Sequence, residues 1–158
     1  MYYLRLVSEE VYLLDTHVPE LISCNNLKQN AFGIIESNNR PRFKISWQST
    51  MMIPKINYLS DNIIAIGIDQ YFAVVDLENQ KELFHIILDS FFMKTAVYSH
   101  FIYVVCQLSI YKINRQSLIL NSEIGLPDIP KKTIINENEL VIVFEDSQIP
   151  SLSIVQNS

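Results

Sequence analysis

A strand, a short polar turn and a second strand recur several times along this chain of 158 residues. Segment 63–76 aligns with segment 2–15 without a gap, and both end in an aspartate. A third copy, 101–112, aligns if its turn is shortened by two residues, and a fourth, 140–155, aligns if its turn is lengthened. Repetition of this kind is typical of an antiparallel β-protein, because the crossover helices of a βαβ protein would show a 3.6-residue period.

Further apolar runs extend the repeated unit. Residues 32–47 form another strand, turn and strand, with Asn38 and Asn39 suited to left-handed turn positions. Runs 82–88 and 117–124 follow the two central hairpins in the place of an additional strand. The clearest match in the set is that of Leu108-Ser-Ile-Tyr with Leu152-Ser-Ile-Val, which assigns these two segments to equivalent strands.

Composition favours strands over helices. Ile and Val supply 34 residues, whereas Ala supplies 4 and Gly 3. The chain is 49% hydrophobic, which excludes an intrinsically disordered tail, and its length predicts a single domain over residues 1–158. One short helix is predicted within 19–29, because Pro19 suits a first helical position and Leu21, Cys24 and Lys28 follow it at helical steps.

The sequence therefore predicts an all-β fold of repeated antiparallel hairpins with at most one short helix. Three or four strands in each 30 to 44 residues resemble the blades of a β-propeller of the WD40 or pyrroloquinoline-quinone-repeat type. This resemblance concerns architecture and covers most of the chain. It implies a small or partial propeller, and a twisted β-sandwich is the alternative.

No catalytic, cofactor or metal pattern is present in the sequence. The histidines His17, His85 and His100 are far apart and lack zinc-ligand spacing, and the glycines are too isolated for a phosphate-binding loop. Cys24 and Cys106 have apolar neighbours and are expected to be small buried hydrophobes. We therefore expect no enzyme activity and no cofactor. The alternative is a hydrolase or lyase in which His100 or Cys106 meets a carboxylate only in three dimensions.

Charge is distributed unevenly along the chain. The formal net charge is −5, yet residues 25–58, which include the hairpin around Arg40 and Arg42, carry a net +4. Residues 121–158 carry a net −4. The overall negative charge argues against nucleic acid as a partner, and the longest uncharged stretch, 95–111, is too short and too polar to span a bilayer.

These exclusions favour recognition of another protein. An acidic contact surface is predicted, and its residues are Glu137, Glu139, Glu145 and Asp146. With no secretory signal and two cysteines, we expect a cytoplasmic location. By class analogy the chain resembles bacterial immunity proteins, which bind and neutralise a toxin domain that is commonly basic. A propeller-like scaffold subunit of a larger complex is the alternative, and a second copy of the chain is a further candidate partner.

Overall fold

The computed structural model describes residues 2–22, 28–37, 40–136 and 139–155, and its strands form four separate sheets. By its internal contacts the chain divides into two compact units. Met1–Asp69 and Ala73–His85 make up the first unit, and Gln70–Phe72 and Ile86–Ser158 make up the second. Within the described residues one helix is present, and no helix is long and apolar enough to cross a membrane.

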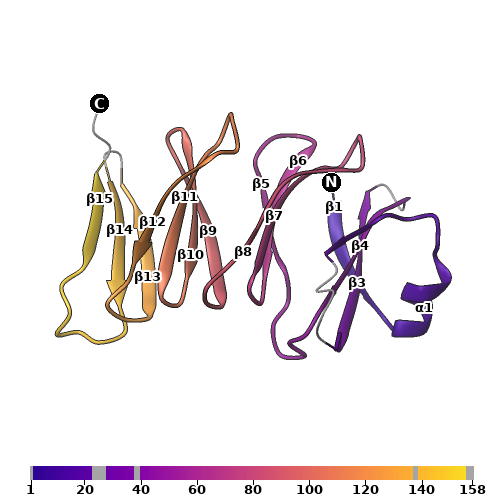
Figure 1. The fold of residues 1–158 in the computed structure, drawn as a ribbon, viewed down its shortest axis with the longest axis horizontal. Helices are drawn as coiled ribbons and strands as arrows, with labels where there is room; N and C mark the ends of the chain where they lie inside the picture. Colours follow the sequence, from indigo (N-terminus) through magenta and orange to yellow (C-terminus); the bar gives the residue numbers. More distant parts are fainter. Residues whose placement is uncertain (1, 23–27, 38–39, 137–138, 156–158) are drawn as a thin grey trace. The chain divides into compact units, whose positions relative to one another are not determined.

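The first unit holds one sheet with strand order β1-β3-β4-β2 and most of a second with order β5-β6-β7-β8 (Figure 1). In the first sheet β1 and β4 run antiparallel to β3, and β2 runs parallel to β4. The strands are β1 (Tyr2–Val7), β2 (Glu20–Ile22), β3 (Ala31–Ser37), β4 (Arg40–Trp47), β5 (Lys55–Tyr58), β6 (Ile63–Ile68), β7 (Tyr71–Asp76) and β8 (Lys81–Ile87).

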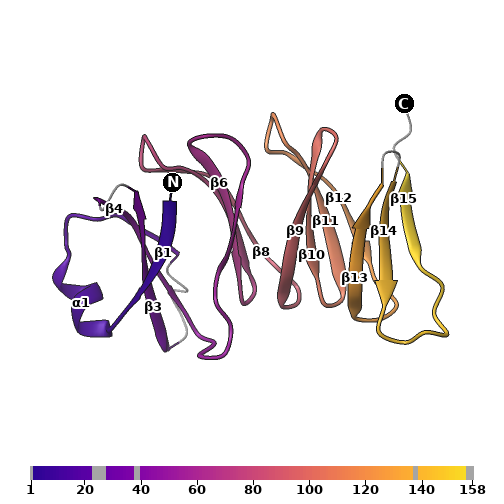
Figure 2. The same ribbon diagram turned by 180° about the vertical axis from the view of Figure 1, so that it is seen from behind.

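The second unit holds a four-stranded sheet, β9-β10-β11-β12, and a three-stranded sheet in which β14 lies between β13 and β15 (Figure 2). Within each of these two sheets, strands that follow one another in sequence pair antiparallel. The strands are β9 (Phe92–Tyr98), β10 (Phe101–Cys106), β11 (Ser109–Asn114), β12 (Leu120–Gly125), β13 (Pro130–Ile135), β14 (Glu139–Phe144) and β15 (Leu152–Val155). A core of buried side chains from both sheets joins them, and it includes Val105, Ile110, Leu140 and Ile142.

The helix does not lie where the sequence predicts it. The segment expected as the second strand of the first hairpin is instead helix α1 (Glu9–Leu14). The Ser8 side chain accepts a hydrogen bond from the Val11 amide, and Glu9 and Glu10 lie in the first turn, where negative charge is favourable. The helix expected within 19–29 is wrong at its start, because Glu20–Ile22 pairs with β4 as strand β2. Residues 23–27, including Cys24, lie outside the described residues.

The repeat is more regular than the sequence alignment indicates. Strands β6, β10 and β14 begin at residues 63, 101 and 139, a spacing of 38 residues, and β7 and β11 begin at 71 and 109 with the same spacing. The hairpins of β6–β7 and β10–β11 are therefore equal in length, and the two-residue shortening of the third copy is wrong. Two loop hydrogen bonds repeat at this spacing: the Leu88 amide donates to Gln70 O and the Leu126 amide donates to Leu108 O, each at 2.8 Å.

The turns that lead to the fourth strands repeat at the same spacing. The Oδ1 atoms of Asp76 and Asn114 each accept hydrogen bonds from the amides two and three residues ahead. Four residues after each of them the backbone is left-handed, with φ of 51° at Gln80 and 55° at Leu118. Side-chain hydrogen bonds thus shape turns that glycine more often makes, as the low glycine content leads one to expect.

The hairpin β14–β15 departs from the repeat. Its connection, residues 145–151, has seven residues, whereas residues 69–70 and 107–108 make two-residue connections in the other two hairpins. In the strand register Leu140 faces Ile154, and the equivalent Ile102 faces Ile113. Ile154 therefore corresponds to Ile113 and not to Ile110, so the match of Leu108-Ser-Ile-Tyr with Leu152-Ser-Ile-Val is wrong by three residues.

Candidate functional site

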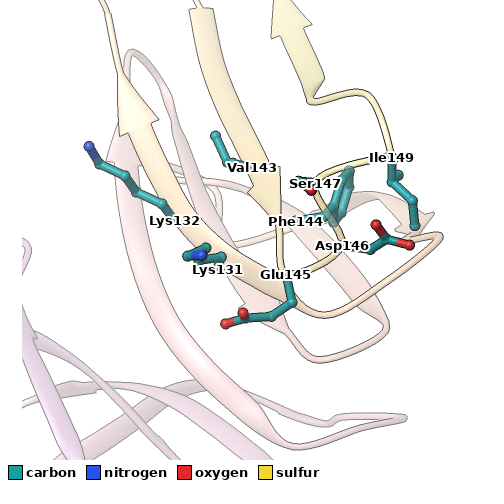
Figure 3. A pocket seen from close by; sticks show the side chains of 8 residues that line it. All are labelled: Lys131, Lys132, Val143, Phe144, Glu145, Asp146, Ser147 and Ile149. Carbon is teal, nitrogen blue, oxygen red and sulfur yellow. The ribbon is translucent and has the colours of Figure 1, made fainter.

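The long connection between β14 and β15 forms one wall of a pocket of 620 Å³. The other wall comes from β13, and the residues that line the pocket are Lys131, Lys132, Val143, Phe144, Glu145, Asp146, Ser147 and Ile149 (Figure 3). Every lining residue belongs to the three-stranded sheet of the second unit or to its β14–β15 loop. The pocket is therefore formed where the 38-residue repeat is interrupted.

A β-bulge places two adjacent lysines in this wall. In a regular strand neighbouring side chains point to opposite faces of the sheet. The pairing of β13 with β14 shifts between Pro130, which faces Phe144, and Lys132, which faces Val143. Because the bulge inserts an extra residue at Lys131, both lysines line the pocket, and both are exposed.

Hydrogen bonds hold the opposite wall in a defined shape. The Asp146 amide donates to Oδ2 of Asp128 at 2.9 Å, and Oδ1 of Asp146 accepts from the Gln148 amide at 2.8 Å. The Glu145 amide donates to Ile129 O at 3.0 Å, which ties the loop to the segment that precedes β13. Backbone hydrogen bonds from Asp146 and Ile129 hold the pKa of Asp128 below its ordinary value.

The pocket combines an apolar floor with charges of both signs. Phe144 is buried and Val143 and Ile149 are half-buried, whereas the two lysines, Glu145 and Asp146 are exposed. Figure 3 shows the Lys132 side chain extending away from the loop that carries the two acids. Among the described residues no ion pair of 4.0 Å or less joins these lysines to the acids. The arrangement leaves four charged groups available to a partner around an apolar surface.

Only part of the predicted acidic surface is brought together. Glu145 and Asp146 are neighbours at the pocket, but Glu139 begins β14 and is separated from Glu145 by a strand length of roughly 20 Å. Its Oε1 accepts a hydrogen bond from Asn136 Nδ2 at 3.2 Å. Glu137 lies outside the described residues. The sequence analysis missed the two lysines, whose signal was the adjacent pair directly after Pro130.

The basic hairpin is less exposed than its charge indicates. Lys44 is buried, its Nζ donates to Tyr12 O at 3.1 Å, and the same atom lies 4.8 Å from the centre of the Tyr12 ring. Arg42 is half-buried in β4. The side chain of Arg40 lies outside the description. Lys44 therefore belongs to the packing of the first unit, and it does not form an open row of cations with Arg42.

The two candidate residues of the hydrolase or lyase alternative, His100 and Cys106, lie apart from each other. His100 precedes β10 and Cys106 ends it, so the full length of the strand separates them. Cys106 is fully buried, and burial raises its pKa to about 12, which keeps the thiol protonated at neutral pH. Within the part of the chain that the structure describes, no group of three or more His, Cys, Asp or Glu side chains is placed to hold a metal ion.

Comparison with known proteins defines the fold class. No family model and no curated protein matches the sequence. Among solved structures, the computationally designed Ika4 protein matches with a TM-score of 0.60 and 12% identity, over 80% of this chain and 80% of that one. BamB from Moraxella catarrhalis matches with a TM-score of 0.54 and 13% identity, over 82% of this chain and 38% of that one. This chain thus spans well under half of BamB.

The chain is an all-β protein with a propeller-like fold, built from blade-like sheets and one short helix in the described residues. The blade architecture predicted from the repeat is confirmed, and the twisted β-sandwich is not supported. At these identities the likeness concerns the fold alone.

Proposed function

We propose that this chain is a protein-binding scaffold whose partner contacts the pocket between β13 and the β14–β15 loop. The observation that carries the proposal is the seven-residue connection of the β14–β15 hairpin, where the hairpins β6–β7 and β10–β11 have two-residue connections. Extra residues in one copy of a repeat extend its surface loops, and binding residues are concentrated in such loops. An apolar floor bordered by charges also has the anatomy of a protein interface, in which an apolar centre lies within a polar rim.

The finer proposal is that the partner is a basic toxin domain and that the chain is its immunity protein. The net charge of −5 and the net −4 of residues 121–158 support it, because opposite net charges accelerate association. Glu145 and Asp146 are the acids at the pocket, and we place them in the contact. The lysines beside them require that the partner also present an acidic group.

The first experiment is affinity capture with the tagged chain at low salt, followed by elution in a salt gradient and mass spectrometry. One stoichiometric basic protein that is released steeply by salt and loses its activity when rebound supports the immunity proposal. Several co-eluting subunits support a scaffold within a larger complex. Recovery of the chain alone contradicts both forms of the proposal.

Charge reversal then tests the site. We expect Glu145→Lys with Asp146→Lys to weaken binding of the recovered partner at least tenfold, because it repels a basic contact. Glu139→Lys is the control at the opposite end of β14, and Glu9→Lys with Glu10→Lys is a matched double reversal on α1. Both controls should retain affinity within about threefold, the change that a distant surface charge produces. Equal losses in all variants would show a general charge effect and remove the pocket from the contact.

A further inference from the structure

A second pocket lies at the turns of the β9–β12 sheet. It measures 320 Å³, and its lining residues are Ser99, His100, Asn114, Arg115 and Gln116. Ser99 and His100 form the turn between β9 and β10, and the other three residues come from the end of β11 and the turn that follows. This pocket is separate from the one assigned to a protein partner and shares no residue with it.

The backbone around this pocket is held in place by hydrogen bonds. The Arg115 amide donates to His100 O at 2.8 Å, so the two turns are joined directly. The Asn114 Oδ1 accepts from the amides of Gln116 and Ser117 at 2.9 Å each. Because its oxygen is engaged, the side chain of Asn114 has only its Nδ2 donor to offer a ligand.

Every side chain of the lining can donate a hydrogen bond, and none is a carboxylate. Arg115 contributes a guanidinium group, Gln116 an amide, Ser99 a hydroxyl and His100 an imidazole. Arg115 gives the pocket a net positive charge. Such a set of donors matches an oxyanion, since arginine binds carboxylate and phosphate oxygens through paired N–H groups.

The 38-residue repeat provides an internal comparison for this position. In the β5–β8 sheet the residues equivalent to His100, Asn114, Arg115 and Gln116 are Asn62, Asp76, Leu77 and Glu78. Leu77, the equivalent of Arg115, is fully buried, and Asn62 Nδ2 donates to Oε2 of Glu78 at 2.6 Å. The turn after β7 thus carries the carboxylates of Asp76 and Glu78, whereas the turn after β11 carries none. The two turns share the hydrogen bonds from the amides to Oδ1 of their first residue, but one is negatively charged and the other positively charged.

We infer that the pocket at the β9–β10 turn binds an oxyanion, a phosphate or a carboxylate group, with Arg115 as its charged anchor. Asn114 Nδ2 and the Gln116 amide supply neutral donors beside it. The site goes beyond the proposed protein-binding function and does not depend on it.

Titration of the ¹⁵N-labelled full chain, followed by NMR, tests this inference. Sodium phosphate is one probe and sodium acetate is the other, and sodium chloride keeps the ionic strength constant. We expect saturable shifts in the side-chain N–H signals of Asn114, Arg115 and Gln116, with a dissociation constant in roughly the millimolar range for a few charge-assisted hydrogen bonds. Comparison of the two probes distinguishes phosphate from carboxylate. Shifts that are absent, do not saturate, or spread evenly over the surface overturn the inference.

Three variants locate the site. Arg115→Gln removes the anchor, and Gln116→Glu introduces the acid found at the equivalent position of the β5–β8 sheet. We expect each to weaken binding about tenfold or more. Lys131→Gln, an exposed cation of the other pocket, removes the same charge and should change affinity less than twofold. If Arg115→Gln fails to fold, Gln116→Glu decides the matter, and unchanged binding in that variant refutes the assignment.

Discussion

The left-handed turn residue Gln80 gives the most direct test of how this chain forms its turns without glycine. Gln80 has a φ of 51°, which costs an L-residue roughly 1–2 kcal/mol. Gln80→Gly removes that cost but increases the freedom of the unfolded chain by about 0.4–1 kcal/mol. The substitution also removes the hydrogen bond from Gln80 Nε2 to Arg42 O, which is 3.1 Å long and exposed.

Gln80→Ala is the matched control, because it loses the same hydrogen bond and keeps the left-handed backbone. The difference between the two variants therefore isolates the backbone contribution, and we expect the glycine variant to be more stable by about 1 kcal/mol. Urea unfolding followed by the fluorescence of Trp47 measures it. Trp47 is the single tryptophan of the chain, and it is buried in the unit that contains Gln80.

With a urea dependence of about 2 kcal/mol per molar, this difference corresponds to a midpoint roughly 0.5 M higher for the glycine variant. Gln80→Asn should fall between the two, since asparagine tolerates the left-handed region better than alanine. An alanine variant as stable as the glycine variant would refute the reasoning, because it would show that the turn relaxes to another conformation without cost.

Three further outcomes are expected. Ile142→Ala should lower the free energy of unfolding of the second unit by about 2–5 kcal/mol, measured by urea unfolding, because Ile142 is fully buried between two sheets. Burial opposes ionisation of Asp89, but hydrogen bonds led by the one from the Ser109 hydroxyl outweigh burial and lower the pKa of Asp89. The ionised carboxylate therefore stabilises the fold above about pH 4, and this stabilisation is lost as the pH falls further. The stability gap between the wild type and Asp89→Asn should therefore narrow from pH 7 to pH 3. In a Cys24→Ser background, Cys106 should react with a thiol reagent at pH 8 only when urea unfolds the chain, since burial raises its pKa to about 12.

Much of the fold was predictable because buried strands leave a strong pattern. The hairpin at 63–76 consists of two nearly continuous apolar runs on either side of an Asp69-Gln70 turn, and both of its strands were located from the sequence. The prediction of a second strand in the first hairpin was wrong because Val11 and Leu14 fit a strand as well as a helix. The signal that indicates a helix is the Ser8 cap followed by two glutamates. Apolar alternation gives no register by itself, which explains why the alignment at Leu152 was wrong by three residues.

The candidate site was predictable only in its acidic half. Glu145 and Asp146 stand out in the sequence as an exposed pair, and the structure places them at the pocket. Lys131 lines the same pocket because of a bulge, and a bulge depends on the pairing of two strands instead of on local sequence. The second pocket was not predicted for a related reason. Arg115 can be compared with its equivalent Leu77 only when the 38-residue register of the repeat is known.

The constant spacing also defines how a chain of this kind can change in length. The amides of Leu88 and Leu126 reach back to the turn of the preceding hairpin with the same 2.8 Å geometry, so each 38-residue copy carries the contacts that close its own junction. Duplicating or removing one copy then changes the number of sheets by one without creating a new type of turn. A copy can also differ in charge while its turn keeps the same hydrogen bonds, as the turns at Glu78 and Gln116 show.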